Sequence, residues 1–365
     1  MNDQRWNKIR THMEEQELDG LLITEPKHVG YLTGFFSDPH ERFLGLAIPK
    51  HDEPFLVVPA LDLEAAKASS SVPLIRTHGD TDDAYALLEG WIGSGAKRFG
   101  IEKEHLSVAR FERLNAALRA SDYRDVGSVL NALRAAKTPE EVEKLRRAVH
   151  LIEAVLTEGL KQVRVGVAEI EIVAELEYQM KKLGAEGPSF DTMVLTGDKT
   201  ALPHGNPGNR KIQAGDMLMF DMGVYLDGYA SDITRTFAVA ERPNDESVKI
   251  YETVLAANLA AIAQIRPGVT LASVDAAARE VITEAGYGPY FMHRLGHGLG
   301  MDVHEYPSVH GANEELVTEG LCFTVEPGVY VAGECGVRIE DDVIVTADGV
   351  DVLTTFPKEL TVIGG

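Results

Sequence analysis

The chain has 365 residues, of which 44% are hydrophobic and 25% are charged. This composition is typical of globular proteins and excludes disordered, collagen-like and low-complexity chains. The 57 acidic and 35 basic residues give a net charge of −22, which disfavours binding to nucleic acid or to an anionic membrane because both carry negative charge. We therefore expect neither nucleic acid nor membrane as a partner.

The chain contains two cysteines, Cys322 and Cys335, which cannot form a disulfide framework for a protein of this size. Residues 1–20 are polar and charged and do not have the pattern of a signal peptide. No uncharged apolar run approaches the roughly 20 residues that span a bilayer. We expect a soluble protein of the reducing cytoplasm.

The first third of the chain alternates apolar runs with helical patterns. Three runs have the length of buried strands, and three later segments have helical periodicity. We expect the strands at 20–24, 43–48 and 55–59, and the helices at 62–68, 84–91 and 109–120. This alternation predicts an α/β domain over residues 1–132, in which we find no glycine-rich phosphate loop.

A helix start marks the boundary that we place at residues 132–138. Thr138 can serve as the N-cap, Pro139 suits the first helical position, and Glu141 can complete a capping box. Apolar residues then recur at helical spacing to about residue 162. We expect a second domain over residues 138–365.

The second domain contains an internal duplication. The sequence VRVGV at 163–167 recurs 102 residues later as IRPGV at 265–269, and DMGVY at 221–225 recurs 105 residues later as EPGVY at 326–330. Two copies are too few for a solenoid. We predict one α+β domain with pseudo-twofold symmetry and a shared site where the halves meet, with chance similarity as the alternative.

The acidic residues of the first copy lie in a β-hairpin. Two β-rich runs over 217–237 flank the dipeptide Asp-Gly at 227–228, a strong hairpin-turn signal. Pairing the runs across that turn places Asp221 opposite Thr234, with Asp232 two residues further along the same face. Diagonal neighbours lie roughly 7–8 Å apart, so the two carboxylates could converge from one side of the sheet.

The duplication pairs Asp221 with Glu326 and Asp232 with Glu340, so four carboxylates would meet between the halves. Apolar residues flank these acids, and buried like charges are costly unless cations neutralise them. Two divalent cations would balance the charge of −4. His297, which lies among glycines, could add a nitrogen ligand. This oxygen-rich set favours Mn²⁺, Co²⁺ or Fe²⁺ and leaves Zn²⁺ open.

Each motif taken alone has a simpler interpretation. An isolated aspartate at a strand end is more often a turn or surface residue than a ligand. His293 and His297 have the spacing of a helical zinc pair, but the glutamate of that motif is missing and glycines disfavour a helix. The metal hypothesis therefore depends on the repetition of the acid pair.

These residues resemble the pita-bread metallopeptidases, which include Xaa-Pro dipeptidases (prolidases), Xaa-Pro aminopeptidases and methionine aminopeptidases. The resemblance lies in the contexts FDMG, SDITRT, GHGLG, VEPGVY and VRIEDD. Residues 138–365 resemble the catalytic pita-bread domain, and residues 1–132 resemble the smaller, ribonuclease H-like creatinase/prolidase N-terminal domain. The resemblance implies that five residues bind two divalent metal ions, with manganese expected: Asp221, Asp232, His297, Glu326 and Glu340, with Asp232 and Glu340 bridging.

The resemblance also implies roles for residues around the metals. His204, His304 and Glu326 are the expected catalytic residues, because the histidines could hydrogen-bond the substrate and the oxyanion while Glu326 transfers a proton. The expected substrate-binding residues are His293, His310 and Arg338.

One departure from the family pattern concerns the substrate carboxylate. Many family dipeptidases carry an arginine shortly after the position of His304, but this chain has Ser308 there. His310, Arg338 or a residue of the first domain could supply the missing charge. This departure favours the aminopeptidase alternative.

We expect an exopeptidase with two metal ions that hydrolyses Xaa-Pro bonds in short proline-containing peptides, most simply a dipeptidase. An Xaa-Pro aminopeptidase acting on longer peptides is the first alternative. A methionine aminopeptidase usually lacks the first domain, and creatinase lacks the acid set. The alternative from another class is a non-catalytic peptide-binding protein on the same fold. The resemblance further implies a homodimer whose first domain narrows access to the site.

Overall fold

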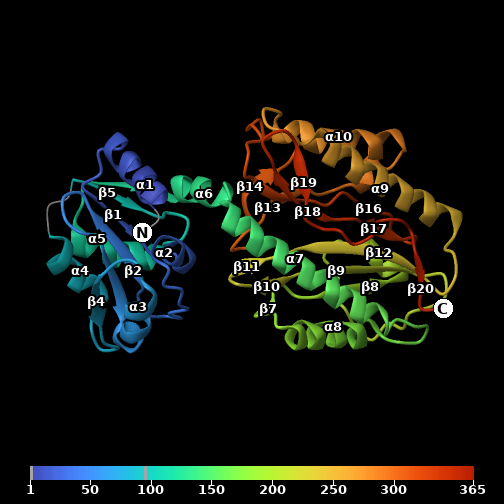
Figure 1. Ribbon diagram of the computed structural model, residues 1–365, viewed down its shortest axis with the longest axis horizontal. Helices are drawn as coiled ribbons and strands as arrows, with labels where there is room; N and C mark the ends of the chain where they lie inside the picture. Colours follow the sequence, from blue (N-terminus) through green and yellow to red (C-terminus); the bar gives the residue numbers. More distant parts are fainter. Residues whose placement is uncertain (1–2, 94–96) are drawn as a thin grey trace. The chain divides into compact units, whose positions relative to one another are not determined.

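The computed structural model describes residues 3–93 and 97–365 (Figure 1). The chain divides into two compact units, Met1–Leu133 and Arg134–Gly365, called the N-terminal unit and the C-terminal unit below. Within the described residues, no helix combines the length and the apolar character needed to cross a membrane.

The N-terminal unit contains a mixed six-stranded sheet in the order β4-β3-β2-β1-β5-β6, accompanied by helices. The strands are β1 (Gly20–Ile23), β2 (Gly45–Pro49), β3 (Phe55–Pro59), β4 (Leu74–His78), β5 (Arg98–Ile101) and β6 (Asp122–Asp125). The helices are α1 (Asp3–Glu15), α2 (Pro26–Thr33), the short η1 (Ala60–Asp62), α3 (Leu63–Ser69), α4 (Ala84–Ile92) and α5 (Val108–Leu118). α6 (Gly127–Ala135) crosses the boundary, so its last two residues, Arg134 and Ala135, belong to the C-terminal unit.

The three strands and three helices predicted for this unit are confirmed, with ends that differ by up to two residues. Three strands, β4, β5 and β6, and the helices α1, α2 and α6 have no matching prediction. β4 and β6 lie at the edges of the sheet and are mostly half-buried or exposed, so their residues need not be apolar. β5 is largely buried, but its four residues include Arg98 and Gly100 and form no apolar run. Hydrophobic runs therefore identified the three adjacent inner strands β1, β2 and β3.

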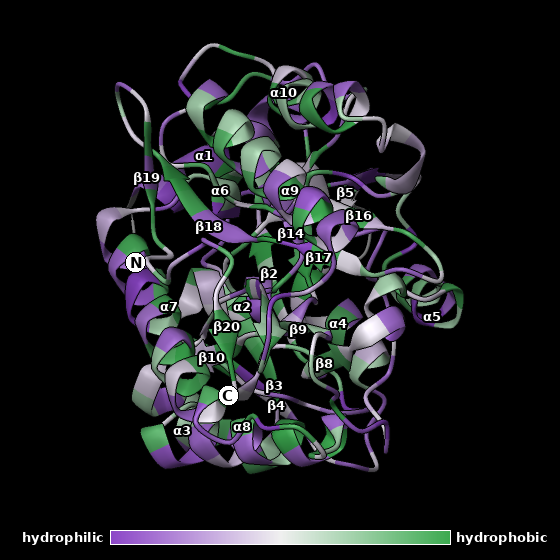
Figure 2. Cartoon of the chain, turned by 90° about the vertical axis from the view of Figure 1, so that its right-hand side faces the viewer, coloured by the Kyte–Doolittle hydropathy of each residue, from purple (hydrophilic) through white to green (hydrophobic). Residues whose placement is uncertain are grey.

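Four long helices frame the C-terminal unit: α7 (Pro139–Leu160), α8 (Glu169–Leu183), α9 (Asp245–Gln264) and α10 (Leu271–Glu284). The predicted capping box at the start of α7 is confirmed, because the Glu141 amide donates to Thr138 Oγ1 and the Thr138 amide donates to the Glu141 carboxylate. Along these helices hydrophilic and hydrophobic residues alternate (Figure 2), as expected where one side of a helix packs on a sheet.

Two sheets lie between these helices, with strand orders β20-β12-β9-β8 and β14-β13-β15-β18-β19, and the smaller sheets are β11-β10-β7 and β16-β17. The strands of the first half are β7 (Gly187–Pro188), β8 (Met193–Thr196), β9 (Met217–Met222), β10 (Val224–Leu226), β11 (Tyr229–Ala230) and β12 (Ile233–Val239). The later strands are β13 (Gly296–Gly298), β14 (Glu305–Val309), β15 (Cys322–Val325), β16 (Gly328–Tyr330), β17 (Gly336–Arg338), β18 (Asp341–Val345), β19 (Val350–Val352) and β20 (Val362–Ile363). Short 3-10 helices lie at η2 (Gly197–Ala201) and η3 (Gly288–Tyr290).

The predicted duplication is confirmed by the backbone of the C-terminal unit. Gly166 and Gly268 both have φ of 90°, and their amides donate equivalent hydrogen bonds of 2.9 Å to the carbonyls of Ile212 and Val317. In each half, two helices precede a strand that pairs with the first arm of a long hairpin. The unit is thus two copies of one helix–helix–strand–hairpin pattern.

Candidate metal centre

The hairpin of the first half places two carboxylates near each other. β9 and β12 pair in the predicted register, with Asp221 opposite Thr234. The turn lies at Asp227 and Gly228, with φ of 52° and 74°, as a two-residue hairpin turn with two left-handed positions requires. Asp232 lies just before β12. The turn dipeptide therefore sets the register that brings Asp232 back beside the end of β9.

Gly223 allows the two arms of this hairpin to approach each other closely. A Cβ atom at this position would lie 1.9 Å from the carbonyl oxygen of Ser231, so no other residue fits without moving the backbone. The amide of Ser231 donates to Val224, which closes the same crossing. The segment that carries Asp232 is consequently held against the end of β9.

The second half repeats this arrangement at Glu326 and Glu340. β15 pairs with β18 so that Val325 lies opposite Asp341, which places both glutamates one step beyond the last pair. The next paired strands, β16 and β17, begin with Gly328 opposite Arg338. In both halves the acids therefore lie where a long hairpin passes from one sheet to the next.

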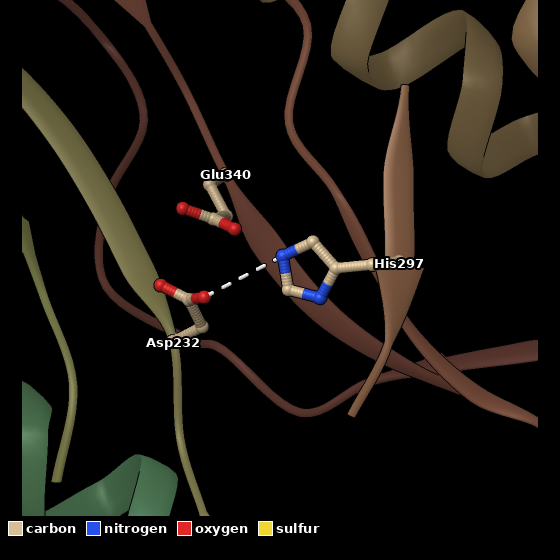
Figure 3. A group of neighbouring side chains, drawn as sticks. All are labelled: Asp232, His297 and Glu340. Carbon is tan, nitrogen blue, oxygen red and sulfur yellow. Dashed lines mark ion pairs between the residues drawn. The ribbon is translucent and has the colours of Figure 1, made fainter. Parts of the chain in front are cut away.

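Acidic side chains from both halves lie close together, and one histidine lies beside them. Asp232, His297 and Glu340 each offer a ligand atom, and these atoms lie within 4.8 Å of one another (Figure 3). His297 Nε2 lies 3.8 Å from Asp232 Oδ2 and 3.4 Å from Glu326 Oε1. The structure thus brings together four of the five predicted ligands, of which Asp232, His297 and Glu340 are buried and Glu326 is half-buried.

The fifth predicted ligand, Asp221, lies beside this group. Its carboxylate accepts a hydrogen bond from Arg338 Nη2. Its charge also contributes to the raised pKa of Asp232, Glu326 and Glu340, although burial is the larger cause for each of them. Asp221 is therefore close to the centre and is oriented by an arginine.

Burial dominates the electrostatics of the group. It raises the pKa of Glu326 to about 7 and raises the pKa of Asp232 and Glu340 well above the ordinary range of a carboxyl. Burial likewise lowers the pKa of His297 to about 3, so its imidazole is neutral at pH 7. Neutral imidazole is the form that coordinates metals.

The residues fit a divalent cation. Asp232 Oδ1 is buried and has no hydrogen-bond partner among the residues that the structure describes. A buried carboxylate oxygen without a partner is unfavourable unless a cation or a proton satisfies it. Together with the neighbouring glutamates and His297, it forms an oxygen-rich donor set with one nitrogen, which suits Mn²⁺, Co²⁺, Fe²⁺ or Zn²⁺.

Three other predicted site histidines, His304, His204 and His310, differ in their surroundings. The ring of His304 is 4.0 Å from the ring of His297, centroid to centroid, and burial lowers the pKa of His304. His204 is exposed, and its charge lowers the pKa of both His293 and His304 slightly, which places it near them. His310 Nδ1 accepts a hydrogen bond from the amide of Ala312.

His293 and Arg338 are bound to protein groups. His293 Nε2 pairs with Tyr330 Oη at 2.9 Å, its Nδ1 pairs with a backbone carbonyl, and burial lowers its pKa to about 4. Arg338 Nη1 donates to Tyr330 Oη at 2.7 Å and Arg338 Nε donates to Thr234 Oγ1 at 3.1 Å. Thr234 in turn donates to Glu340 Oε2 at 2.6 Å. Arg338 therefore links Asp221 to Glu340 through Thr234.

Sequence reasoning missed Thr234, Tyr330 and Arg294. Arg294 is half-buried, and its Nη1 donates to Ser308 Oγ at 3.1 Å. Its charge lowers the pKa of Glu326, which places it near the metal centre. Within residues 3–93 and 97–365 no carboxylate lies within ion-pair distance of it. The contact of Arg294 with Ser308 depends on the pairing of β13 with β14, so no local pattern in the sequence could have revealed it.

Comparisons with known proteins agree with this geometry. The model of metallopeptidase family M24 matches residues 143–347, and that of the creatinase/prolidase N-terminal domain matches residues 5–136. A relative from Bacillus subtilis is 42% identical over 98% of this chain and 99% of its own length.

Solved structures resemble both units of the chain. An Xaa-Pro dipeptidase from Bacillus anthracis has a TM-score of 0.92 at 34% identity, covering 99% of each chain. A prolidase from Pyrococcus furiosus has a TM-score of 0.88 at 35% identity, covering 95% of this chain and 99% of its own. An X-Pro aminopeptidase from Thermotoga maritima has a TM-score of 0.86 at 32% identity, covering 97% and 100%.

Proposed function

Because this chain belongs to metallopeptidase family M24, we propose that it hydrolyses the Xaa-Pro bond of dipeptides with the help of two divalent metal ions. The similar structures include both Xaa-Pro dipeptidases and an X-Pro aminopeptidase, so the shared fold does not distinguish the two activities. A feature of this chain's own site has to favour one of them.

The observation that carries the proposal is the guanidinium of Arg294. It lies near Glu326, and it donates to the neutral hydroxyl of Ser308, with no carboxylate partner among the described residues. A dipeptide presents its free carboxylate one residue after the bond to be cut, whereas a longer peptide presents a neutral amide there. A half-buried cation without an acid partner is suited to bind that carboxylate. Arg294 thus supplies the charge that Ser308 cannot.

The residues of the candidate metal centre have different roles in the proposed hydrolysis. Asp221, Asp232, His297, Glu326 and Glu340 would hold two divalent ions, for which we propose manganese, and bound ions would activate a water and polarise the scissile carbonyl. Glu326 accepts the proton of the attacking water and delivers it to the leaving proline nitrogen, which carries no hydrogen in the substrate. His204 and His304 donate hydrogen bonds to the substrate and to the developing oxyanion.

We also propose the setting in which this enzyme works. Residues 1–132 and 138–365 form its two domains, and it acts in the cytoplasm as a homodimer. Both cysteines, Cys322 and Cys335, are buried and unpaired, which supports a reducing compartment. The net charge of −22 supports the expectation that neither nucleic acid nor an anionic membrane is a partner.

The test compares substrates that differ at the carboxylate. The full chain is loaded with Mn²⁺ and assayed with Ala-Pro, Ala-Pro-amide and Ala-Pro-Ala. We expect Ala-Pro to be the best substrate. Arg294→Met should lower kcat/KM for Ala-Pro by about 10- to 100-fold, the worth of a charge-assisted hydrogen bond, and should leave kcat/KM for Ala-Pro-amide unchanged.

Two other outcomes would contradict the proposal. A preference for Ala-Pro-Ala that Arg294→Met does not alter would identify an aminopeptidase. A chain that binds about two Mn²⁺ ions but hydrolyses none of the three peptides would not be an Xaa-Pro peptidase.

A further inference from the structure

A cluster of ion pairs surrounds the residue that follows His304 in the sequence. Its centre is Glu305, whose side chain is 5% exposed. Arg134 Nη2 donates to Glu305 Oε1 at 2.6 Å, Lys137 Nζ donates to Glu305 Oε2 at 3.3 Å, and the amide of Asp302 donates to Glu305 Oε1 at 2.9 Å. Arg134 Nη2 also donates to Asp302 Oδ2 at 2.6 Å. One carboxylate thus receives three hydrogen bonds, two of them from cations.

The strand ladder does not fix the position of His304. β13 and β14 pair His297 with Ser308, but the register then shifts, and Gly298 pairs with Glu305. His304 lies one residue outside that last pair. Side-chain contacts therefore have to hold this segment in place.

The Glu305 carboxylate packs against the backbone of the preceding loop. A Cβ atom at Gly300 would lie 2.6 Å from Glu305 Oε1, so a larger residue at this position would displace the carboxylate from its partners. The amide of Gly300 donates to the carbonyl of Asp302, and the carbonyl of Gly300 accepts the amide of Ala230. The loop 300–305 is consequently folded around the Glu305 side chain.

The cluster is balanced in charge. Although Glu305 is buried, Lys137 and Arg134 keep its pKa below its ordinary value, so it remains ionised. Breaking such a pair by removing one partner is strongly unfavourable, but replacing the whole cluster by apolar residues is often neutral for stability. A buried cluster at this position is therefore better explained by a specific conformation than by stability.

We propose that Glu305, Arg134 and Lys137 are positioning residues that hold the loop 300–305 so that the His304 ring lies against His297. The inference rests on the proposed function, in which His304 contacts the substrate. Arg134 and Lys137 come from the segment that leads into α7, and this segment is itself anchored because the Lys137 amide donates to the Gly320 carbonyl at 2.8 Å. The start of the C-terminal unit thereby supports the active site.

The test is a double-mutant cycle in the Mn²⁺-loaded full chain. Glu305→Gln keeps the shape of the side chain and removes its charge. We expect it to lower kcat/KM for Ala-Pro by about 10- to 100-fold, as removal of a group that orients an active-site residue does. In a His304→Ala background the same substitution should cause no further loss, because the residue that it positions is already absent.

Glu102→Gln is the matched control. Glu102 belongs to the N-terminal unit, its side chain is 3% exposed, and it also has three polar partners: the amides of Thr24 and Glu25 and the His28 ring. We expect Glu102→Gln to lower the melting temperature and leave kcat/KM of the folded enzyme unchanged. Arg134→Lys, which keeps the charge but offers one nitrogen, should show the same coupling to His304 with a smaller loss and serves where Glu305→Gln does not fold.

Three results would overturn the inference. The first is an equal loss of activity from Glu305→Gln, or from Arg134→Lys in its place, in both backgrounds. The second is unchanged activity in the His304-containing variants. The third is a fall in bound Mn²⁺, measured by mass spectrometry of the metal, because the cluster would then act on the ligands. An inactive wild type with bound Mn²⁺ would instead contradict the proposed function.

Discussion

The two halves of the C-terminal unit share a backbone but differ in the strand beside the first hairpin arm. In the first half this strand is β8, in which Met193 and Leu195 are buried in a small apolar cluster with Met219 and Tyr330. In the second half it is β13, which carries His297. The first half contributes Asp232 to the group and places Asp221 beside it, whereas the second half contributes Glu326, Glu340 and an imidazole.

Duplication of the half and later divergence of the two copies therefore make different contributions to the candidate metal centre. A hairpin that ends in two carboxylates, when doubled about a pseudo-twofold axis, provides the negative charge that the two proposed cations would balance. The proposed nitrogen ligand, His297, and the cation of Arg294 both come from the second half, so the two sides of the centre differ. A symmetric pair of acids can bind metal, whereas a site that orients a peptide needs unequal sides.

Substitution of one acid in each half tests the equality of their contributions and should have the largest effect. Asp232→Asn and Glu340→Gln should each lower kcat/KM for Ala-Pro by on the order of 10³-fold or more, because each removes a charged ligand from the same buried group. Bound Mn²⁺, measured by mass spectrometry of the metal, should fall in both variants. Full activity in either variant would refute equal participation of the halves.

Arg338→Met tests whether the second half orients an acid of the first. Arg338 donates to Asp221 and to Thr234, so its loss frees the Asp221 carboxylate. We expect kcat/KM to fall by about 10- to 100-fold, the usual effect of removing a group that orients a ligand. Arg146→Met is the control, because it breaks a partly exposed ion pair with Asp351 and should leave activity unchanged. Equal activity of the two variants would remove Arg338 from the site.

The free energy of unfolding of the metal-free protein should depend on pH, because acids from both halves lie close together in the fold. Glu326 has an ordinary pKa of 4.5, and burial raises it to about 7, so the folded protein holds this proton more tightly than the unfolded chain. The stability that this group contributes is complete below about pH 4.5 and is lost as the pH rises through about 7.

Urea unfolding with EDTA measures this effect. Between about pH 5 and about pH 8, the free energy of unfolding of the wild type should decline relative to that of Glu326→Gln. Saturating Mn²⁺ should abolish the decline, because bound cations stabilise the ionised acids. A constant difference between the two proteins with EDTA would show that Glu326 does not titrate in this range.

Local rules predicted those parts of the fold that are close in sequence. The opposition of Asp221 and Thr234 follows from counting outward from the turn at 227–228, and the capping box at Thr138 follows from four adjacent residues. The repeat then transferred the first acid pair to the second half. These inferences needed only strand periodicity, turn chemistry and one internal alignment.

Contacts between distant segments escaped the same reasoning. Arg134 reaches Glu305 across 171 residues, and no pattern in either segment indicates the other. Arg294 meets Ser308 across a register that is irregular after His297, which local counting cannot supply. The substrate-binding role expected for Arg338 stays a prediction, since three of its nitrogens bind protein groups.

The N-cap residues of α8 and α10 also differ between the halves, and substitutions there should have the smallest effect. The N-cap residue of α10 is Thr270, whose side chain accepts a hydrogen bond from the amide of Ser273. The N-cap residue of α8 is Ala168, which offers no side-chain acceptor. Thr270→Ala should lower the free energy of unfolding by about 1 kcal/mol, and Ala168→Ser should raise it by up to about 1 kcal/mol. Ala168 has an extended backbone with φ of −87° and ψ of 153°, which a capping serine also adopts.

Chemical denaturation of both variants with Mn²⁺ present measures these differences. Neither residue lies among the acids or histidines of the centre, so kcat/KM should not change. If Ala168→Ser is less stable than the wild type, the packing around Ala168 is too tight to accommodate the additional oxygen atom. The halves would then have diverged in packing at their helix starts as well as in the polarity of their strands.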